Sequence, residues 1–252
     1  VLKVLFLIRY IDELPGSVDN LVTLCVDGID VDKLALRRKV EKSLEHLENE
    51  TLVARNGDMY MFLTNEERTI GNEIKNQSVP SGSEERELGR LIFEEVFGDD
   101  RKYTYPATGR IFVYTRLCDD HPVGIKLEGN LEVAVVSPLG DSYGEFLDDN
   151  ACANDHMIHS TRLLIRLPDH ASLGNELRTL LRTDSYVRLK RTSTLPESTN
   201  RILRDRHEEN KERGKRLVVL IKQLLSEASY FACGKKLNGR TSDPKQALDD
   251  AL

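Results

Sequence analysis

Asn56-Gly57 gives the sharpest structural signal in this 252-residue sequence. The dipeptide stands between two runs of strand-forming residues, 51–55 and 58–64. Asn-Gly in such a place is typical of a β-hairpin, because both central residues of the favoured turn need a positive φ. The sequence therefore predicts two strands that pair through a tight turn at Asn56-Gly57.

Three helical segments, 2–12, 17–25 and 32–49, are predicted ahead of this hairpin. Ser17 and Asp32 stand where their side chains can accept hydrogen bonds from the unpaired amides of the second and third helix. The third helix has one apolar stripe, formed by Leu36, Val40, Leu44 and Leu47. Three helices followed by a hairpin predict a winged helix-turn-helix domain over residues 1–68.

Four basic residues are the candidate contacts of this domain. In a winged helix-turn-helix, the helix before the hairpin can enter the DNA major groove; here it offers Arg37, Arg38 and Lys42, and the hairpin offers Arg55. Residues 1–68 hold 9 basic and 13 acidic side chains, a net charge of −4, which leaves little cationic surplus to displace DNA counterions. Two interpretations stay open: contact with double-stranded DNA, or pairing with nearby glutamates on a domain that docks onto protein.

A second domain follows a linker at residues 69–83, which ends in a Ser/Pro/Gly cluster. Residues 84–97 are amphipathic, and a helix over 171–183 can cover a sheet of apolar strands. Those strands are predicted at 110–117, 131–136 and 161–167, with a weaker one around Tyr103 and Tyr105. We therefore expect an α+β domain over 84–252 with a mainly antiparallel sheet.

A long charged helix is predicted over residues 196–229, with Pro196 at its first position. Its first half is nearly all polar and is expected to project from the body. Residues 160–240 hold 18 basic and 9 acidic side chains, so this part is basic although the chain as a whole is at −6. Arg201, Arg204 and Lys215 are the candidate contacts of this arm, for nucleic acid or a partner protein; a solvated helix face explains them equally.

The sequence offers no convincing catalytic constellation. It has no P-loop motif, since Cys233-Gly234-Lys235-Lys236 lacks the first glycine and the hydroxyl residue. The cluster of Cys152, Asp155, His156 and His159 resembles a metal site but lacks a second ligand pair. Asp119-Asp120-His121 follows a strand end, and a turn before Pro122 explains it as well as catalysis does. We therefore expect no catalytic, cofactor-binding or metal-binding residue in this chain.

Membrane insertion is excluded by the sequence, because no stretch approaches the roughly eighteen uninterrupted apolar residues that a membrane span needs. The four cysteines are far apart and are interpreted as reduced thiols, so a cytoplasmic location is expected.

Several stretches resemble the large P-loop ATPase of bacteriophage exclusion (BREX) defence systems, a bacterial antiviral family. They are residues 2–12, 18–24, 34–41, 55–58, 62–67, 165–169 and 195–197. The resemblance implies a region that follows the ATPase core, with ATP and Mg²⁺ bound by the parent protein and none by this fragment. It carries no catalytic residue onto these positions. The start of the chain inside a helical pattern leads to the same expectation, an excised piece.

Two functions follow as alternatives. In the first, the chain is a non-catalytic region of a BREX ATPase that contacts double-stranded DNA, other BREX proteins or its own copies. In the second, it is a free-standing winged-helix transcriptional regulator with an appended sensing or oligomerisation domain.

Overall fold

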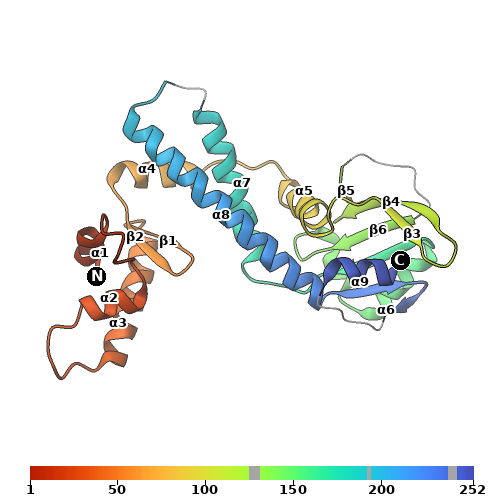
Figure 1. The fold of residues 1–252 in the computed structure, drawn as a ribbon, viewed down its shortest axis with the longest axis horizontal. Coiled ribbons are helices and arrows are strands. Elements are labelled where there is room, and N and C mark those ends of the chain that lie inside the picture. The colour runs from red at the N-terminus through yellow and green to blue at the C-terminus, as the bar shows by residue number, and fades with distance from the viewer. Residues whose placement is uncertain (125–130, 192–193, 238–242) are drawn as a thin grey trace. The chain divides into compact units, whose positions relative to one another are not determined.

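The computed structural model describes residues 1–252 except 125–130, 192–193 and 238–242 (Figure 1). The chain forms two compact units. The first contains Val1–Gln77 and Leu189–Glu209, and the second contains Ser78–Arg188 and Asn210–Leu252. This division differs from the predicted domains, because residues 189–209 group with the N-terminal part instead of the α+β domain.

Three helices and a hairpin open the first unit: α1 (Leu2–Ile8), α2 (Val18–Leu24), α3 (Lys33–Asn49), β1 (Val53–Asn56) and β2 (Met59–Phe62). The Ser17 hydroxyl accepts from the Asn20 amide, and the Asp32 carboxylate accepts from two amides of the first turn of α3. These caps fix the two helix starts as the sequence predicts. The small core of this bundle consists of Leu5, Ile8, Leu21, Val22, Val40, Leu44 and Val53.

The hairpin is present, but its turn lies one residue later than predicted. Asn56 pairs with Met59, so Gly57 and Asp58 are the two loop residues. Gly57 has φ +61°, while Asn56 is not among the residues with positive φ. A glycine at the first loop position is the signature of a type II′ turn, which needs only one left-handed residue. Asn56 is therefore the last strand residue and not a turn residue.

A third segment pairs with this hairpin just before α2. The Tyr60 amide donates to the Gly16 carbonyl at 2.9 Å, and Ser17 forms an isolated bridge with Met59. Any side chain at position 16 would overlap the Tyr60 carbonyl oxygen. Gly16 is therefore required by close backbone approach.

Helix α4 (Asn65–Lys75) covers residues 69–75 of the segment 69–83 that was predicted as linker. Thr64 and Glu67 form a reciprocal capping box at its start, and the helix then continues into the predicted linker. Residues of the 189–209 segment contact this helix: Lys190 pairs with Glu73 at 3.2 Å, and the Thr199 hydroxyl donates to Glu66 at 2.6 Å. These contacts explain why the segment belongs to the first unit.

The second unit is built on one sheet with the order β3-β4-β6-β7-β8-β9, and β5 pairs with β4 at one end. The strands are β3 (Lys102–Tyr105), β4 (Arg110–Cys118), β5 (His121–Pro122), β6 (Leu131–Val136), β7 (Arg162–Arg166), β8 (Ser229–Ala232) and β9 (Lys235–Lys236). The sheet is mixed: among the described strands four of the six pairings are antiparallel, as predicted for most of the sheet, and two are parallel, which the sequence did not predict. The central strands β4, β6 and β7 are parallel, and only the outer pairs are antiparallel.

The central strands are parallel because both faces of the sheet are covered. On β6 and β7, Val133, Val135 and Ile165 belong to one core and Val136 and Leu164 to another, as the two-residue period requires. Strands that are apolar on both faces are typical of parallel sheets. Both cores are buried, with Val133 at 0% exposure in the first and Leu164 at 2% in the second.

The larger core receives α5 (Ser83–Arg90), its continuation as a π-helix η1 (Leu91–Val96), α7 (Leu173–Lys190), α8 (Glu197–Glu227) and α9 (Pro244–Ala251). The smaller core lies under η2 (Asp141–Phe146) and α6 (Asp149–Asn154), which η3 (Asp155–Met157) follows. Within the described ranges, no helix is both long and apolar enough to cross a bilayer, the 31-residue α8 included.

Helix α8 occupies the long helix predicted at 196–229, but its first half is not free of the body. Ile202 is 7% exposed and Leu203 is 4% exposed, and both lie in the part of the helix that belongs to the first unit. Two apolar side chains in a polar run are enough to give this half a buried face, so the expectation of a projecting arm is wrong here.

Candidate interaction surfaces

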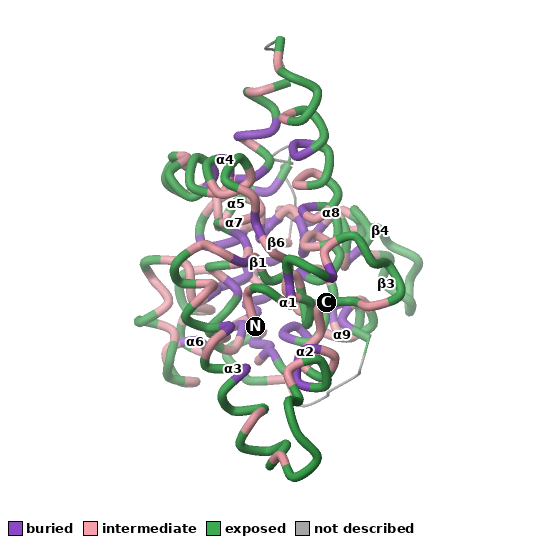
Figure 2. The backbone as a smooth tube through the Cα atoms, turned by 90° about the vertical axis from the view of Figure 1, so that its left-hand side faces the viewer, coloured by how far each residue is buried: buried purple, intermediate pink, exposed green. Residues whose placement is uncertain are grey.

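The four cations predicted as contacts of the N-terminal bundle differ in their surroundings. Arg37 pairs with Asp19 at 2.5 Å and with Glu41 at 3.1 Å. Arg38 and Lys42 are exposed on α3, which shows exposed and half-exposed residues along most of its length in Figure 2. The charge of Arg37 is thus largely neutralised, whereas Arg38 and Lys42 face solvent.

Arg55 is held within the hairpin itself. Its Nε donates to the Gly57 carbonyl at 2.8 Å, its guanidinium lies 5.5 Å from the Tyr60 ring centroid, and Asp58 is 3.8 Å away. These contacts fasten the side chain across the turn. Arg55 therefore supports the hairpin turn, while its side chain remains half exposed.

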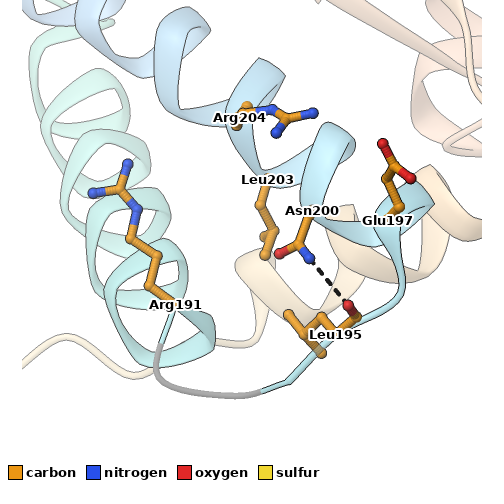
Figure 3. Close-up of a pocket in the computed structure, with 6 residues that line it drawn as sticks. All are labelled: Arg191, Leu195, Glu197, Asn200, Leu203 and Arg204. Atoms are coloured by element: carbon orange, nitrogen blue, oxygen red, sulfur yellow. Dashed lines mark hydrogen bonds between the residues drawn. The ribbon is translucent and has the colours of Figure 1, made fainter.

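The three predicted cations of the long helix are divided between the units. Arg201 and Arg204 lie in the first unit, and Lys215 lies in the second, where it pairs with Glu212 at 2.7 Å. Arg204 and Arg191 line a 370 Å³ surface pocket together with Leu195, Glu197, Asn200 and Leu203. Figure 3 shows that the two guanidinium groups point in different directions and that Asn200 donates to the Leu195 carbonyl. The pocket thus does not focus positive charge on one point.

An exposed apolar surface on and after α1 is the most prominent surface that the sequence reasoning missed. Phe6, Leu7, Tyr10 and Ile11 are 56%, 70%, 80% and 45% exposed, and we call these four the α1 surface. The Phe6 ring meets Phe62 edge-on at 5.3 Å, which holds it in place. A helix that is apolar on all sides is normally buried on all sides, and α1 (LKVLFLI) buries only Leu5 and Ile8. The apolar residues on all sides of this helix were the sequence signal from which the α1 surface could have been predicted.

Asp119 is a buried carboxylate in the second unit. It accepts hydrogen bonds from the Ser137 amide at 2.7 Å and from the Ser137 hydroxyl at 2.6 Å. Asp119 and Asp120 have φ values of +46° and +62° and form the two-residue turn between β4 and β5. Burial raises the pKa of Asp119 to about 6, against the hydrogen bonds from Ser137, which lower it. The turn therefore accounts for the presence of Asp119 and Asp120 at this position, and Ser137 donates to both carboxylate oxygens of Asp119.

A family comparison decides where the chain belongs. The family model for the fourth domain of the BREX ATP-binding protein BrxC, described as having a six-stranded β-sheet, matches residues 77–252. The chain belongs to this BrxC family. The match begins at the edge of the second unit and covers all of its sheet, whose continuous path contains six strands with β5 beside it. The resemblance to the BREX ATPase is thereby confirmed, and the chain is part of a BREX defence protein. No solved structure matches.

The segment of this chain that most resembles a P-loop does not have the geometry of one. The sequence closest to a P-loop, Cys233-Gly234-Lys235-Lys236, is the turn between β8 and β9. A P-loop leads into a helix whose first amides face the phosphates, and here a strand follows instead. Lys236 is also engaged, since its ammonium lies 2.8 Å from Asp149. The phosphate-binding chemistry of the family therefore does not map onto this turn.

The metal-like cluster of the BrxC domain is used for internal contacts. Asp155 pairs with Arg162 at 3.2 Å, and the buried Cys152 thiol lies 3.1 Å from the Phe146 carbonyl. In the part of the chain that the structure describes, no three histidine, cysteine or acidic side chains gather as a metal site would require.

Proposed function

We propose that this chain is a non-catalytic, cytoplasmic docking region of a BREX ATP-binding protein, with a winged helix-turn-helix bundle that binds protein through the α1 surface. The observation that carries the proposal is the exposure of Phe6, Leu7, Tyr10 and Ile11 on one short helix and the turn after it. Burying such side chains contributes about 1.5–3 kcal/mol each. The three helices, the hairpin and the bridge from Ser17 to Met59 support the winged-helix assignment.

The partner that we propose is the ATP-binding portion of BrxC, which carries ATP and Mg²⁺ outside the residues of this chain. Two observations support protein as the partner of the bundle. Its cations Arg37 and Arg55 are held by Asp19 and by the hairpin, and its net charge is negative. A net negative charge and exposed rings suit a protein interface better than a phosphate backbone.

The test is binding of this chain to the ATP-binding portion of BrxC, measured by calorimetry. Leu7→Glu combined with Tyr10→Glu is expected to weaken binding at least tenfold, because two carboxylates would have to be desolvated. Ile29→Glu is the matched control, since Ile29 is fully exposed in the same bundle. Equal affinity of the double variant and the control would refute the docking role. Sedimentation of the chain alone shows whether its own copies use the same surface.

A second function, contact with double-stranded DNA, is favoured by one observation: Arg38 and Lys42 are exposed one helical turn apart on α3. The match of residues 77–252 to the BrxC family favours DNA contact by a part of BrxC over a free-standing DNA-binding regulator. Weakened duplex binding after removal of these two charges would support it.

A further inference from the structure

The hairpin formed by β3 and the first half of β4 lies at the edge of the second unit's sheet (Figure 1). Its sequence concentrates cations and aromatic rings. Between Arg101 and Cys118 the sequence has four basic and four aromatic side chains and no carboxylate. They are Arg101, Lys102, Arg110 and Arg116, and Tyr103, Tyr105, Phe112 and Tyr114. The chain as a whole has a net charge of −6, so this composition stands apart from its surroundings.

Pairing places Tyr103, Tyr105, Arg110 and Phe112 on one face of the hairpin and the exposed Lys102 on the other. Tyr103 lies opposite Phe112, and Tyr105 lies opposite Arg110. Because cross-strand partners and residues two apart share a face, these four side chains form one row, which we call the ribbon face. The Arg110 guanidinium lies 5.0 Å from the centroid of the Phe112 ring, and Tyr105 is 45% exposed.

The next residues on the ribbon face anchor it to the body. Tyr114 and Arg116 are each 3% exposed, and Arg116 pairs with Asp99 at 2.8 Å. In the described residues β4 pairs with β6 only from Tyr114 onward. Tyr103 packs against the larger core, so the solvent-facing part of the ribbon face is formed by Tyr105, Arg110 and the half-buried Phe112.

We propose that the ribbon face binds single-stranded nucleic acid. An unpaired base can stack on Tyr105, and Arg110, which lies over the Phe112 ring, can pair with the neighbouring phosphate. Aromatic stacking needs bases whose faces are free, which a duplex does not offer at its grooves. The ribbon face lies in the second unit, so it is independent of the α1 surface and of the docking function proposed for it.

The experiment is fluorescence anisotropy of labelled oligonucleotides with the 252-residue chain. The probes are fifteen-residue poly-dT, poly-U and a duplex of the same length. Tyr105→Ala is expected to weaken single-strand binding about five- to hundredfold, the range of one lost base stack. Ile111→Ala is the matched control, because Ile111 is 59% exposed on the reverse face of the same hairpin. Tyr105→Phe keeps the ring and is expected to bind within about twofold of the parent.

Salt dependence tests the cation separately. Arg110→Gln is expected to lower the slope of log affinity against log salt by about 0.7, the value for one contact with a single strand. Lys102→Gln, an exposed cation on the reverse face, is expected to leave the slope nearly unchanged. Tighter binding of either single strand than of the duplex supports the proposal, and the poly-dT and poly-U arms tell DNA from RNA.

Three results would overturn it: no binding of either single strand, a preference for the duplex, or equal losses in Tyr105→Ala and Ile111→Ala. Thermal unfolding of each variant shows whether the hairpin is intact. If Tyr105→Ala fails to fold, the comparison of Arg110→Gln with Lys102→Gln decides, and equal slopes for these two would count against the ribbon face.

Discussion

The amide and the hydroxyl of Ser137 both donate to the buried carboxylate of Asp119, at 2.7 and 2.6 Å. This contact joins the end of β4 to the residue that follows β6. A methyl group at Gly140 would lie 2.5 Å from the same carboxylate, so the loop leaves no room for water on that side. Burial outweighs the two hydrogen bonds and raises the pKa of Asp119 from 3.8 to about 6.

We predict that Asp119 makes folding less favourable as pH rises from about 4 to 6. In that range the unfolded chain has released the proton that the folded chain still holds, so the free energy of unfolding falls. A shift of this size corresponds to about 3 kcal/mol. The Asp119→Asn variant keeps the acceptor and does not titrate. In urea unfolding between pH 4 and 7, the free energy of unfolding of the variant is expected to rise relative to that of the parent by about this amount. A difference between the two that does not change with pH would contradict the prediction.

Glu67 is expected to show the opposite pH dependence. Burial raises its pKa, but hydrogen bonds from Arg9 and Thr64 outweigh burial, so the pKa is lowered overall. Its contribution to stability is therefore present above the ordinary glutamate range and is lost as pH falls through the lowered value. Glu67→Gln should lower the free energy of unfolding at pH 7 by about 1–3 kcal/mol, whereas Glu45→Gln, an exposed glutamate on α3, should change little. An equal effect of the two changes would refute the role of the Arg9 contact.

Gly16 and Gly71 form a matched pair of glycine substitutions. Gly16→Ala should destabilise the bundle by about 1–3 kcal/mol or more, because the new methyl group overlaps the Tyr60 carbonyl. Gly71→Ala should stabilise α4 by about 0.5–1 kcal/mol, since it lies inside a helix with nothing within 4 Å. Thermal or urea unfolding of both variants gives the comparison, and a stabilising Gly16→Ala would show that the segment before α2 is not held against β2.

The two exposed cations of α3 give a test of DNA contact. If the bundle docks onto protein as proposed, Arg38→Gln combined with Lys42→Gln leaves the affinity for a duplex and its salt slope nearly unchanged. If the two residues contact phosphates, the slope falls by about 1.8, or 0.9 for each charge. Titrations of the parent and the double variant at several salt concentrations decide between these outcomes.

The sequence predicted the helix starts and the hairpin, because these depend on residues close together along the chain. Ser17 and Asp32 cap their helices as expected, and the Gly57 turn follows from a glycine that tolerates positive φ. The turn moved by one residue because a glycine at its first position satisfies a type II′ turn, and the sequence alone did not separate this from a turn with Asn56 inside it.

Tertiary relationships explain what the sequence reasoning missed. The parallel pairing of β6 with β7 follows from burial on both faces, and the apolar runs Val133–Val136 and Leu163–Ile165 carried that signal without showing direction. Assignment of 189–209 to the first unit depends on contacts with α4, such as Lys190 with Glu73. Among the predicted site residues, Arg37 pairs with Glu41 at helical spacing, as one of the two interpretations expected. Its second partner Asp19, and the Gly57 carbonyl that Arg55 contacts, were not predicted.

The order of the strands has a consequence for biosynthesis. Strand β7 meets β8 only after the whole of α7 and α8 has been made, although β4, β6 and β7 can already lie side by side. Until then the edge of β7 keeps its backbone donors and acceptors unpaired and is open to any other extended peptide. We therefore expect a nascent chain of this family to be most prone to mispairing after β7 has been synthesised and before Tyr230 and Phe231 of β8 have left the ribosome.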